Sequence, residues 1–220
     1  KNLTEVAIPA SVTSIGEAAF RDSISLTNVT IPDSVTSIPR DVFKNCSGLT
    51  RVTIPGSVTS IGYRSFYGCS GLTSITIPDS VTTIGFGAFQ DCTGLTAVVI
   101  PDSVTKIGAE AFNDSYNMNS VTIPDSVTLI RTAAFTGTSL TTVSIPNSAT
   151  VIEAGAFDSS VTIFSGKAAT IDSQQTEAST AVGETLVLAM VTSGKDVTHQ
   201  WSKDGTDIAG ATSETLELSS

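Results

Sequence analysis

The chain has 220 residues, and its 11 basic and 21 acidic side chains give it a net charge of −10. This acidic balance argues against a nucleic-acid or anionic-membrane partner, because both are recognised through clusters of lysine and arginine. No apolar run approaches the roughly 18 residues that a membrane-spanning helix needs, so we expect no membrane insertion.

A 23-residue period organises the first three quarters of the chain, and residues 72–94 are its clearest copy. Two unrelated residue types keep the step, which shortens by one residue at the end. Phenylalanine recurs at Phe20, Phe43, Phe66, Phe89, Phe112, Phe135 and Phe157, and proline at Pro9, Pro32, Pro55, Pro78, Pro101, Pro124 and Pro146. Such a period predicts a repeat solenoid, in which each coil buries its apolar face against its neighbours.

Within this copy, the alternation in residues 72–77 predicts a short strand with positions 72, 75 and 77 directed inward. Pro78 should end that strand because it has no N–H to donate, and the side chains of Asp79-Ser80 offer acceptors to nearby backbone N–H groups in a turn. Residues 81–84 predict a second extended segment. Residues 86–92 predict one turn of helix or 3₁₀ helix.

Repetition turns each inward position into a column of similar side chains. One column comprises Leu3, Leu26, Leu49, Leu72, Leu95, Met118 and Leu140, and another comprises Ile15, Ile38, Ile61, Ile84, Ile107, Ile130 and Ile152. We expect these columns and the phenylalanines to form the core. The parallel strands of neighbouring coils should pair about 4.8 Å apart.

The repeated pattern L-x-x-I-x-I-P-x-S-V-T-x-I-G-x-x-A-F-x-x-C closely resembles the BspA-like class of leucine-rich repeat proteins. The resemblance covers seven coils over residues 1–164. It implies a leucine-rich-repeat horseshoe, which is a curved right-handed solenoid with a parallel β-sheet on its concave side. It also implies adhesion to host or matrix proteins. Pro39 and Arg131 at the corner glycine and Ala149 at the valine position predict small local irregularities.

Residues 165–220 lack the period and predict a separate all-β module with a hairpin at Asp204-Gly205. Strands are expected at 185–191, 197–201 and 215–218. The segment resembles the front half of a bacterial immunoglobulin-like domain with Trp201 as its core tryptophan. No cysteine precedes Trp201 on its strand, and the last two strands of such a sandwich are missing, so we expect a truncated domain. Lys1 opens inside the repeat, as in a cropped or processed chain.

Cys46, Cys69 and Cys92 occupy one position in successive coils. A metal ladder and a disulfide are both conceivable there. Core packing is favoured, because serine fills the same position in other coils and no histidine or C-x-x-C spacing accompanies the cysteines.

Asp79, Asp102 and Asp125 form another column, with neighbouring carboxylates one coil apart. A Ca²⁺ ion would relieve their repulsion, whereas the simpler interpretation is that each aspartate caps its own turn. The single histidine, His199, has no nucleophile motif around it, and no paired carboxylates indicate a cleft. We expect no metal, no cofactor and no enzymatic activity.

Aromatic side chains break the pattern at one place. Tyr63 and Phe86 occupy the same outward position in adjacent coils, Arg40 holds it in the coil before, and Tyr67 lies near in sequence. Exposed aromatic and arginine side chains dominate the binding energy of many interfaces. Arg40, Tyr63, Tyr67 and Phe86 are therefore the candidate partner-binding residues.

The sequence thus predicts a non-enzymatic module at the cell surface or in the extracellular space that binds proteins. Two alternatives stay open. One is a structural stalk without a specific ligand. The other is a glycan-binding module, because the outward side of the first strands is nearly uncharged and rich in threonine, although threonine also simply suits a strand surface.

Overall fold

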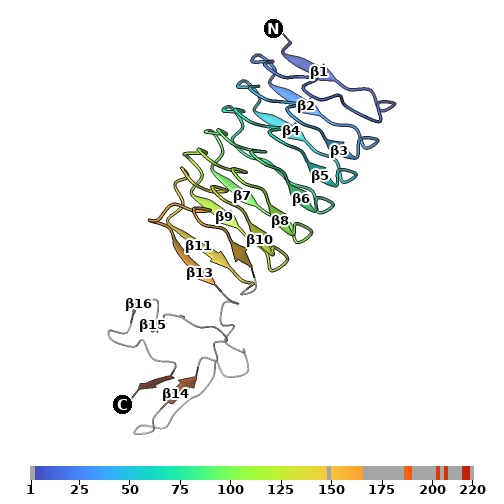
Figure 1. Cartoon of the computed structure of the whole chain (residues 1–220). Helices are drawn as coiled ribbons and strands as arrows, with labels where there is room; N and C mark the ends of the chain where they lie inside the picture. Colours follow the sequence, from blue (N-terminus) through green and yellow to red (C-terminus); the bar gives the residue numbers. More distant parts are fainter. Residues whose placement is uncertain are drawn as a thin grey trace.

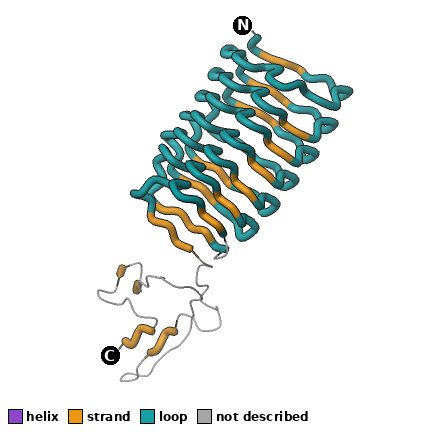
Figure 2. Tube along the Cα trace, viewed as in Figure 1, coloured by secondary structure: helices purple, strands orange, loops and turns teal. Residues whose placement is uncertain are grey.

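The computed structural model describes residues 3–147 and 150–165, and four short tail strands at 186–189, 202–203, 206–207 and 215–218. About seven coils stack along one axis, and the coil that contains β1 forms one end of the stack (Figure 1). Each coil follows one path through a first strand side, a proline turn, a second strand side and a turn side. Most coils form a short strand on each of the two strand sides (Figure 2). The predicted solenoid with 23-residue coils is confirmed.

The first side carries short parallel strands in register with the neighbouring coils. These strands are β1 (Glu5–Ala7), β2 (Asn28–Thr30), β4 (Arg51–Thr53), β7 (Ala97–Val99), β9 (Ser120–Thr122), β11 (Thr142–Ile145) and β13 (Thr162–Ser165). They pair in three groups, β1-β2-β4, β7-β9 and β11-β13. The central valine of β2 and β4 is buried between two exposed residues, as the alternation predicted.

The strand expected at residues 72–77 is not formed, so that prediction was wrong for the copy that defined the repeat. Residues 73–77 lie between β4 and β7 and pair with neither. Ile75 and Ile77 are nevertheless buried, so the inward positions are as predicted. One residue type sets this segment apart from the strands β1, β2, β4, β7, β9 and β11: Ile75 holds the central position, where those strands carry Val6, Val29, Val52, Val98, Val121 and Val143.

The second side is a continuous six-stranded parallel sheet of two-residue strands, in the order β12-β10-β8-β6-β5-β3. The strands are β3 (Ser37–Ile38), β5 (Ser60–Ile61), β6 (Thr83–Ile84), β8 (Lys106–Ile107), β10 (Leu129–Ile130) and β12 (Val151–Ile152). This sheet continues through the fourth coil, where the first side is interrupted.

The third side consists of successive turns, which corrects the prediction of a short helix or 3₁₀ turn. In the second coil, the N–H groups of Asp41, Phe43 and Asn45 donate to carbonyls of the third coil at 2.9, 2.8 and 2.7 Å. The alternate N–H groups close turns within the coil. A helix would use all of them internally. Asp41 and Asn45 have φ angles of 56° and 58°, and similar left-handed residues recur in the other coils.

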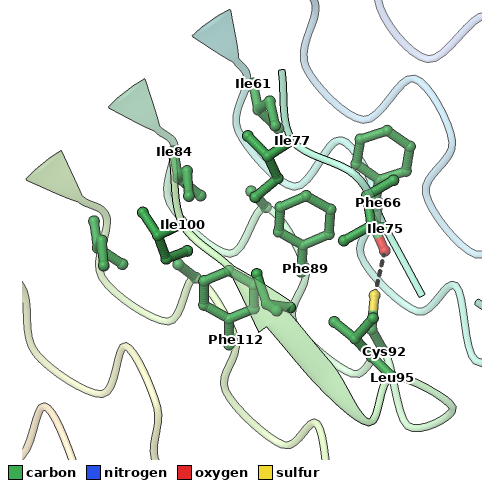
Figure 3. Packing of buried hydrophobic residues seen from close by; sticks show 14 of the residues in the cluster. Ile61, Phe66, Ile75, Ile77, Ile84, Phe89, Cys92, Leu95, Ile100 and Phe112 are labelled. Carbon is green, nitrogen blue, oxygen red and sulfur yellow. Dashed lines mark hydrogen bonds between the residues drawn. The ribbon is translucent and has the colours of Figure 1, made fainter. Parts of the chain in front are cut away.

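The core is built from the predicted columns. Phe43, Phe66, Phe89, Phe112 and Phe135 have no exposed surface. Successive phenylalanine rings stack in parallel, with 5.2 Å between the centroids of Phe66 and Phe89 and between those of Phe89 and Phe112 (Figure 3). In the first coil Leu3 is 39% exposed.

Serine side chains link the proline turns of the second to sixth coils to the coil before. Ser103 Oγ, for example, donates to the carbonyl of Val81 at 2.6 Å, and the equivalent serines form the same bond 22 residues back. The turn itself closes through the N–H of Val81, which donates to the carbonyl of Pro78 at 3.0 Å. The serine is thus a donor between coils, whereas the sequence suggested an acceptor within its own turn.

In the tail, β14 (Leu186–Ala189) pairs antiparallel with β17 (Thr215–Leu218), and β15 (Ser202–Lys203) pairs antiparallel with β16 (Thr206–Asp207). The second pair flanks the predicted hairpin position. Residues 197–201, with His199 and Trp201, lie outside the described residues, as does Ala149. The truncated immunoglobulin-like domain remains a prediction.

Candidate partner-binding patch

The turn side of the second to fourth coils brings three of the predicted residues into one row. The rings of Tyr63 and Phe86 stack with their centroids 5.1 Å apart and their planes 9° from parallel. The guanidinium carbon of Arg40 lies 4.6 Å from the centroid of Tyr63. Because the three residues occupy one column, the row runs along the solenoid axis.

Arg64, which the sequence analysis did not single out, connects this row to Tyr67. Its guanidinium carbon lies 5.2 Å from the ring centroid of Tyr63, 5.3 Å from that of Phe86 and 5.4 Å from that of Tyr67. Lys44 Nζ lies 5.0 Å from the Tyr67 ring. We call Arg40, Lys44, Tyr63, Arg64, Tyr67 and Phe86 the aromatic patch. Arg64 and Lys44 lie on the same turn side as the other four residues, and the period alone could have indicated this.

Gly87 gives Arg64 the space that it needs. The glycine occupies Arg64's column in the next coil, and an added Cβ would fall 3.1 Å from Arg64 Cγ. The side chain extends over this glycine, so that Arg64 Nη2 lies 3.9 Å from Glu110 Oε2 in the fifth coil. The glycine therefore has a packing role.

Carboxylates and aromatic ring faces hold the two arginines of the patch in place. Arg40 Nε lies 3.3 Å from Oδ2 of Asp41, whose side chain is buried in the turn. Arg64 Nε is buried and has no hydrogen-bond partner in the described part of the chain. Its cationic group instead faces the aromatic rings, which attract a cation through their electron-rich faces.

Tyr67 lies close to an acidic side chain. Interaction with the Asp91 carboxylate raises the pKa of Tyr67 above the ordinary value of 10.0, and partial burial acts in the same direction. Both effects favour the protonated phenol.

The patch is accessible but ordered by its own contacts. The side chain of Arg40 is 56% exposed and that of Arg64 is 29% exposed. The three aromatic residues are half-buried. Groups that are already held in place lose little conformational freedom when a partner binds.

The cysteine column is explained by packing. Cys46, Cys69 and Cys92 are free thiols with no exposed surface. Each Sγ donates to a phenylalanine carbonyl of the preceding coil, at 3.2 Å for Cys92 (Figure 3). Ser115 Oγ forms the equivalent bond at 3.1 Å. Burial raises the pKa of Cys46 to about 11 and that of Cys92 to about 12.

The aspartate column gains no support as a metal site. Asp79, Asp102 and Asp125 are exposed. Within the described ranges, no group of three or more His, Cys, Asp or Glu side chains is placed to hold a metal ion. None of the described segments is a helix long and apolar enough to cross a bilayer.

Comparison with known protein families identifies one match. Residues 1–118 and 82–175 match the family described as BspA type leucine rich repeat region, in six copies. No curated protein sequence matches the chain significantly.

Solved structures share the fold. A leucine rich cell surface protein from Faecalibacterium prausnitzii A2-165 is 38% identical, with a TM-score of 0.69, over 77% of this chain and 49% of its own. The chain thus spans about half the length of that protein. Leucine rich repeat proteins from T. pallidum and Bacteroides ovatus ATCC 8483 are 28% and 25% identical, with TM-scores of 0.59 and 0.55. They match 74% of this chain, and 73% and 51% of their own chains respectively.

Proposed function

Because the chain belongs to the BspA-type leucine-rich repeat family, we propose that it is a non-enzymatic binding module that recognises protein partners. The observation that carries the proposal is the aromatic patch, in which Arg40, Tyr63 and Phe86 form a stacked row beside Arg64. Arginine and tyrosine are enriched among the residues that dominate protein interfaces.

The rings of the row are not needed to build the coil. Other coils carry Glu17, Ala109 and Thr132 at the position of Tyr63 and Phe86, and these coils have the same turn side. The phenylalanine of the fifth coil, Phe112, is as fully buried as Phe66 and Phe89, although its coil has Ala109 at the patch position. The fold therefore does not require the two adjacent aromatic side chains Tyr63 and Phe86 on the turn side. This favours a role for them in recognition.

The cations of the patch favour a partner surface with an acidic component. Arg40, Lys44 and Arg64 bring three positive charges together on a chain whose net charge is −10. Three carboxylates lie beside this patch: Asp41 is buried in the turn next to Arg40, Glu110 lies 3.9 Å from Arg64, and Asp91 interacts with Tyr67. A carboxylate of the partner would meet cations, and an apolar side chain would meet the ring edges.

We place this module at the cell surface or in the extracellular space. Support comes from the F. prausnitzii relative, which is described as a cell surface protein. The family resemblance further favours host or matrix proteins as ligands. These finer points rest on similarity, because one fold serves many functions.

A binding screen tests the proposal. The full chain is passed over immobilised extracellular-matrix and plasma proteins, alongside the Tyr63→Ser/Phe86→Ser double variant. We expect saturable binding to at least one protein, and its loss in the double variant. Tyr116→Ser is the matched control, because Tyr116 is 56% exposed and lies outside the patch. No saturable binding to any protein would favour the structural stalk.

A further inference from the structure

The first strand side of the solenoid is open beside the fourth coil. β4 pairs with β2, and β7 pairs with β9, but neither pairs with residues 73–77 between them (Figure 1). A hollow of about 740 Å³ lies at this opening. Its lining comes from residues 50–54, from Thr73, Ser74 and Thr76, and from Asn28. It lies on a different side of the coil from the aromatic patch.

The lining is rich in hydroxyl groups. Thr50, Thr53, Thr73, Ser74 and Thr76 contribute hydroxyls. Of the residues that line the hollow, Val52 and Ile54 are buried and the others are exposed. Hydroxyl and amide groups in a hollow of this volume match the hydroxyls of one or two sugar rings, and ligand sites typically measure about 300 to 1,000 Å³.

The opening also leaves backbone groups free. In the coils before it, the N–H and Oγ1 of Thr50 both donate to the carbonyl of Thr27, at 2.9 and 3.1 Å. Thr73 holds the same position one coil later but makes neither bond to the carbonyl of Thr50 in the described structure. Its N–H and hydroxyl, and the Thr50 carbonyl, remain available to a ligand.

Arg51 supplies a charge. The arginines at positions 21, 40, 64 and 131 each lie within 4.0 Å of an acidic side chain. Arg51 is the exposed exception, with neither an ion pair nor a hydrogen bond from its side chain in the described part of the chain. Its neighbours in the column are the neutral Asn28 and the small Ser74. A guanidinium group left free beside hydroxyls suits a planar carboxylate, which it binds in a two-pronged geometry.

We propose that this hollow binds an acidic carbohydrate, in which a sugar carboxylate pairs with Arg51 and sugar hydroxyls bond to Thr50, Thr73 and Ser74. The proposal is independent of the protein-binding patch. An extended peptide that pairs with the open strand edge is the rival occupant, and neutral sugars are the matched control ligands.

Calorimetric titration of the full chain with trigalacturonate, sialyllactose and neutral lactose tests it. We expect saturable binding of at least one acidic sugar and none of lactose. Arg51→Gln should weaken that binding at least tenfold. Lys106→Gln, which removes an exposed cation from β8 on the second strand side, should leave it unchanged.

Three results would overturn the proposal: no acidic sugar binds, Arg51→Gln binds as tightly as the unaltered chain, or Lys106→Gln weakens binding equally. If the chain binds extended peptides but none of the sugars, the rival occupant is favoured and the proposal is wrong. Tyr63→Ser/Phe86→Ser should not alter sugar binding, so this proposal and the protein-binding function fail separately.

Discussion

The side chain of Arg64 lies over Gly87, and the two residues occupy the same column in adjacent coils. This contact lets the guanidinium group reach Tyr63, Phe86 and Tyr67 together. A larger residue in place of the glycine would occupy the path of the arginine. The arrangement of the aromatic patch thus depends on a glycine that is not one of its six residues.

Gly87→Ala should lower the free energy of unfolding by roughly 1–2 kcal/mol, because its φ of 55° lies in the left-handed region and its Cβ would crowd Arg64. Urea denaturation followed by circular dichroism measures this. Gly56→Ala is the control, since a Cβ there meets nothing within 4 Å. Equal effects of the two substitutions would contradict the role of Gly87.

Phe89→Ala should cost about 3–5 kcal/mol of stability, because a fully buried ring is replaced by a cavity between Phe66 and Phe112. Thermal and urea unfolding provide the readout. Phe164→Ala, at a ring that is 50% exposed, should change stability far less. A similar loss at both positions would argue against the stacked core.

The residues that form each buried column could be predicted from the sequence, because packing in a solenoid is periodic. Phe89, Ile84 and Leu72 are buried as expected. The turn side was misjudged, because a spacing that suits a helix also suits successive turns. The column of Asp22, Asn45, Gly68, Asp91, Asp114 and Gly137 contains the types that tolerate a left-handed φ, and that signal argued for turns.

The site was predictable in part for the same reason. Tyr63, Phe86 and Arg40 share a column, so their proximity follows from the period. The position of Arg64 depends on the free path over Gly87, which is a three-dimensional relation. The interruption at residues 73–77 coincides with one conservative change, Ile75 in place of the valine of the other coils. Isoleucine suits a strand as well as valine does, so this change did not predict the hollow beside Arg51.

Cys92→Ser should leave stability within roughly 1 kcal/mol of the original, because a serine hydroxyl can donate the same bond and the energy of such a bond is about that size. Ser115 already forms it in the next coil. Cys92→Ala should be less stable than Cys92→Ser, since it removes the donor to the Phe66 carbonyl. The reverse order in urea unfolding would show that the bond contributes nothing.

Stability should fall at alkaline pH through the buried thiols. Burial raises the pKa of Cys46 to about 11 and that of Cys92 to about 12 from the ordinary value of 9.0. The folded chain therefore binds these protons more firmly than the unfolded chain. Their contribution is complete below pH 9 and is lost as pH rises toward the folded-state values.

Unfolding free energies measured between pH 8 and pH 11 check this expectation. A variant with all three cysteines changed to serine should show a shallower decline than the unaltered chain. The comparison isolates the thiols, because Tyr67 and Tyr116, whose pKa values are also raised, are present in both proteins. Identical slopes would contradict the prediction.

The most direct test of the central claim is the dissociation constant of a protein ligand found by screening, measured for three proteins. Relative to the unaltered chain, we expect Tyr63→Ser/Phe86→Ser to bind at least roughly 30-fold more weakly, since each central interface residue typically contributes about 2 kcal/mol or more. Tyr116→Ser should bind with unchanged affinity. Unchanged affinity of the double variant would contradict the assignment of the aromatic patch as the binding surface.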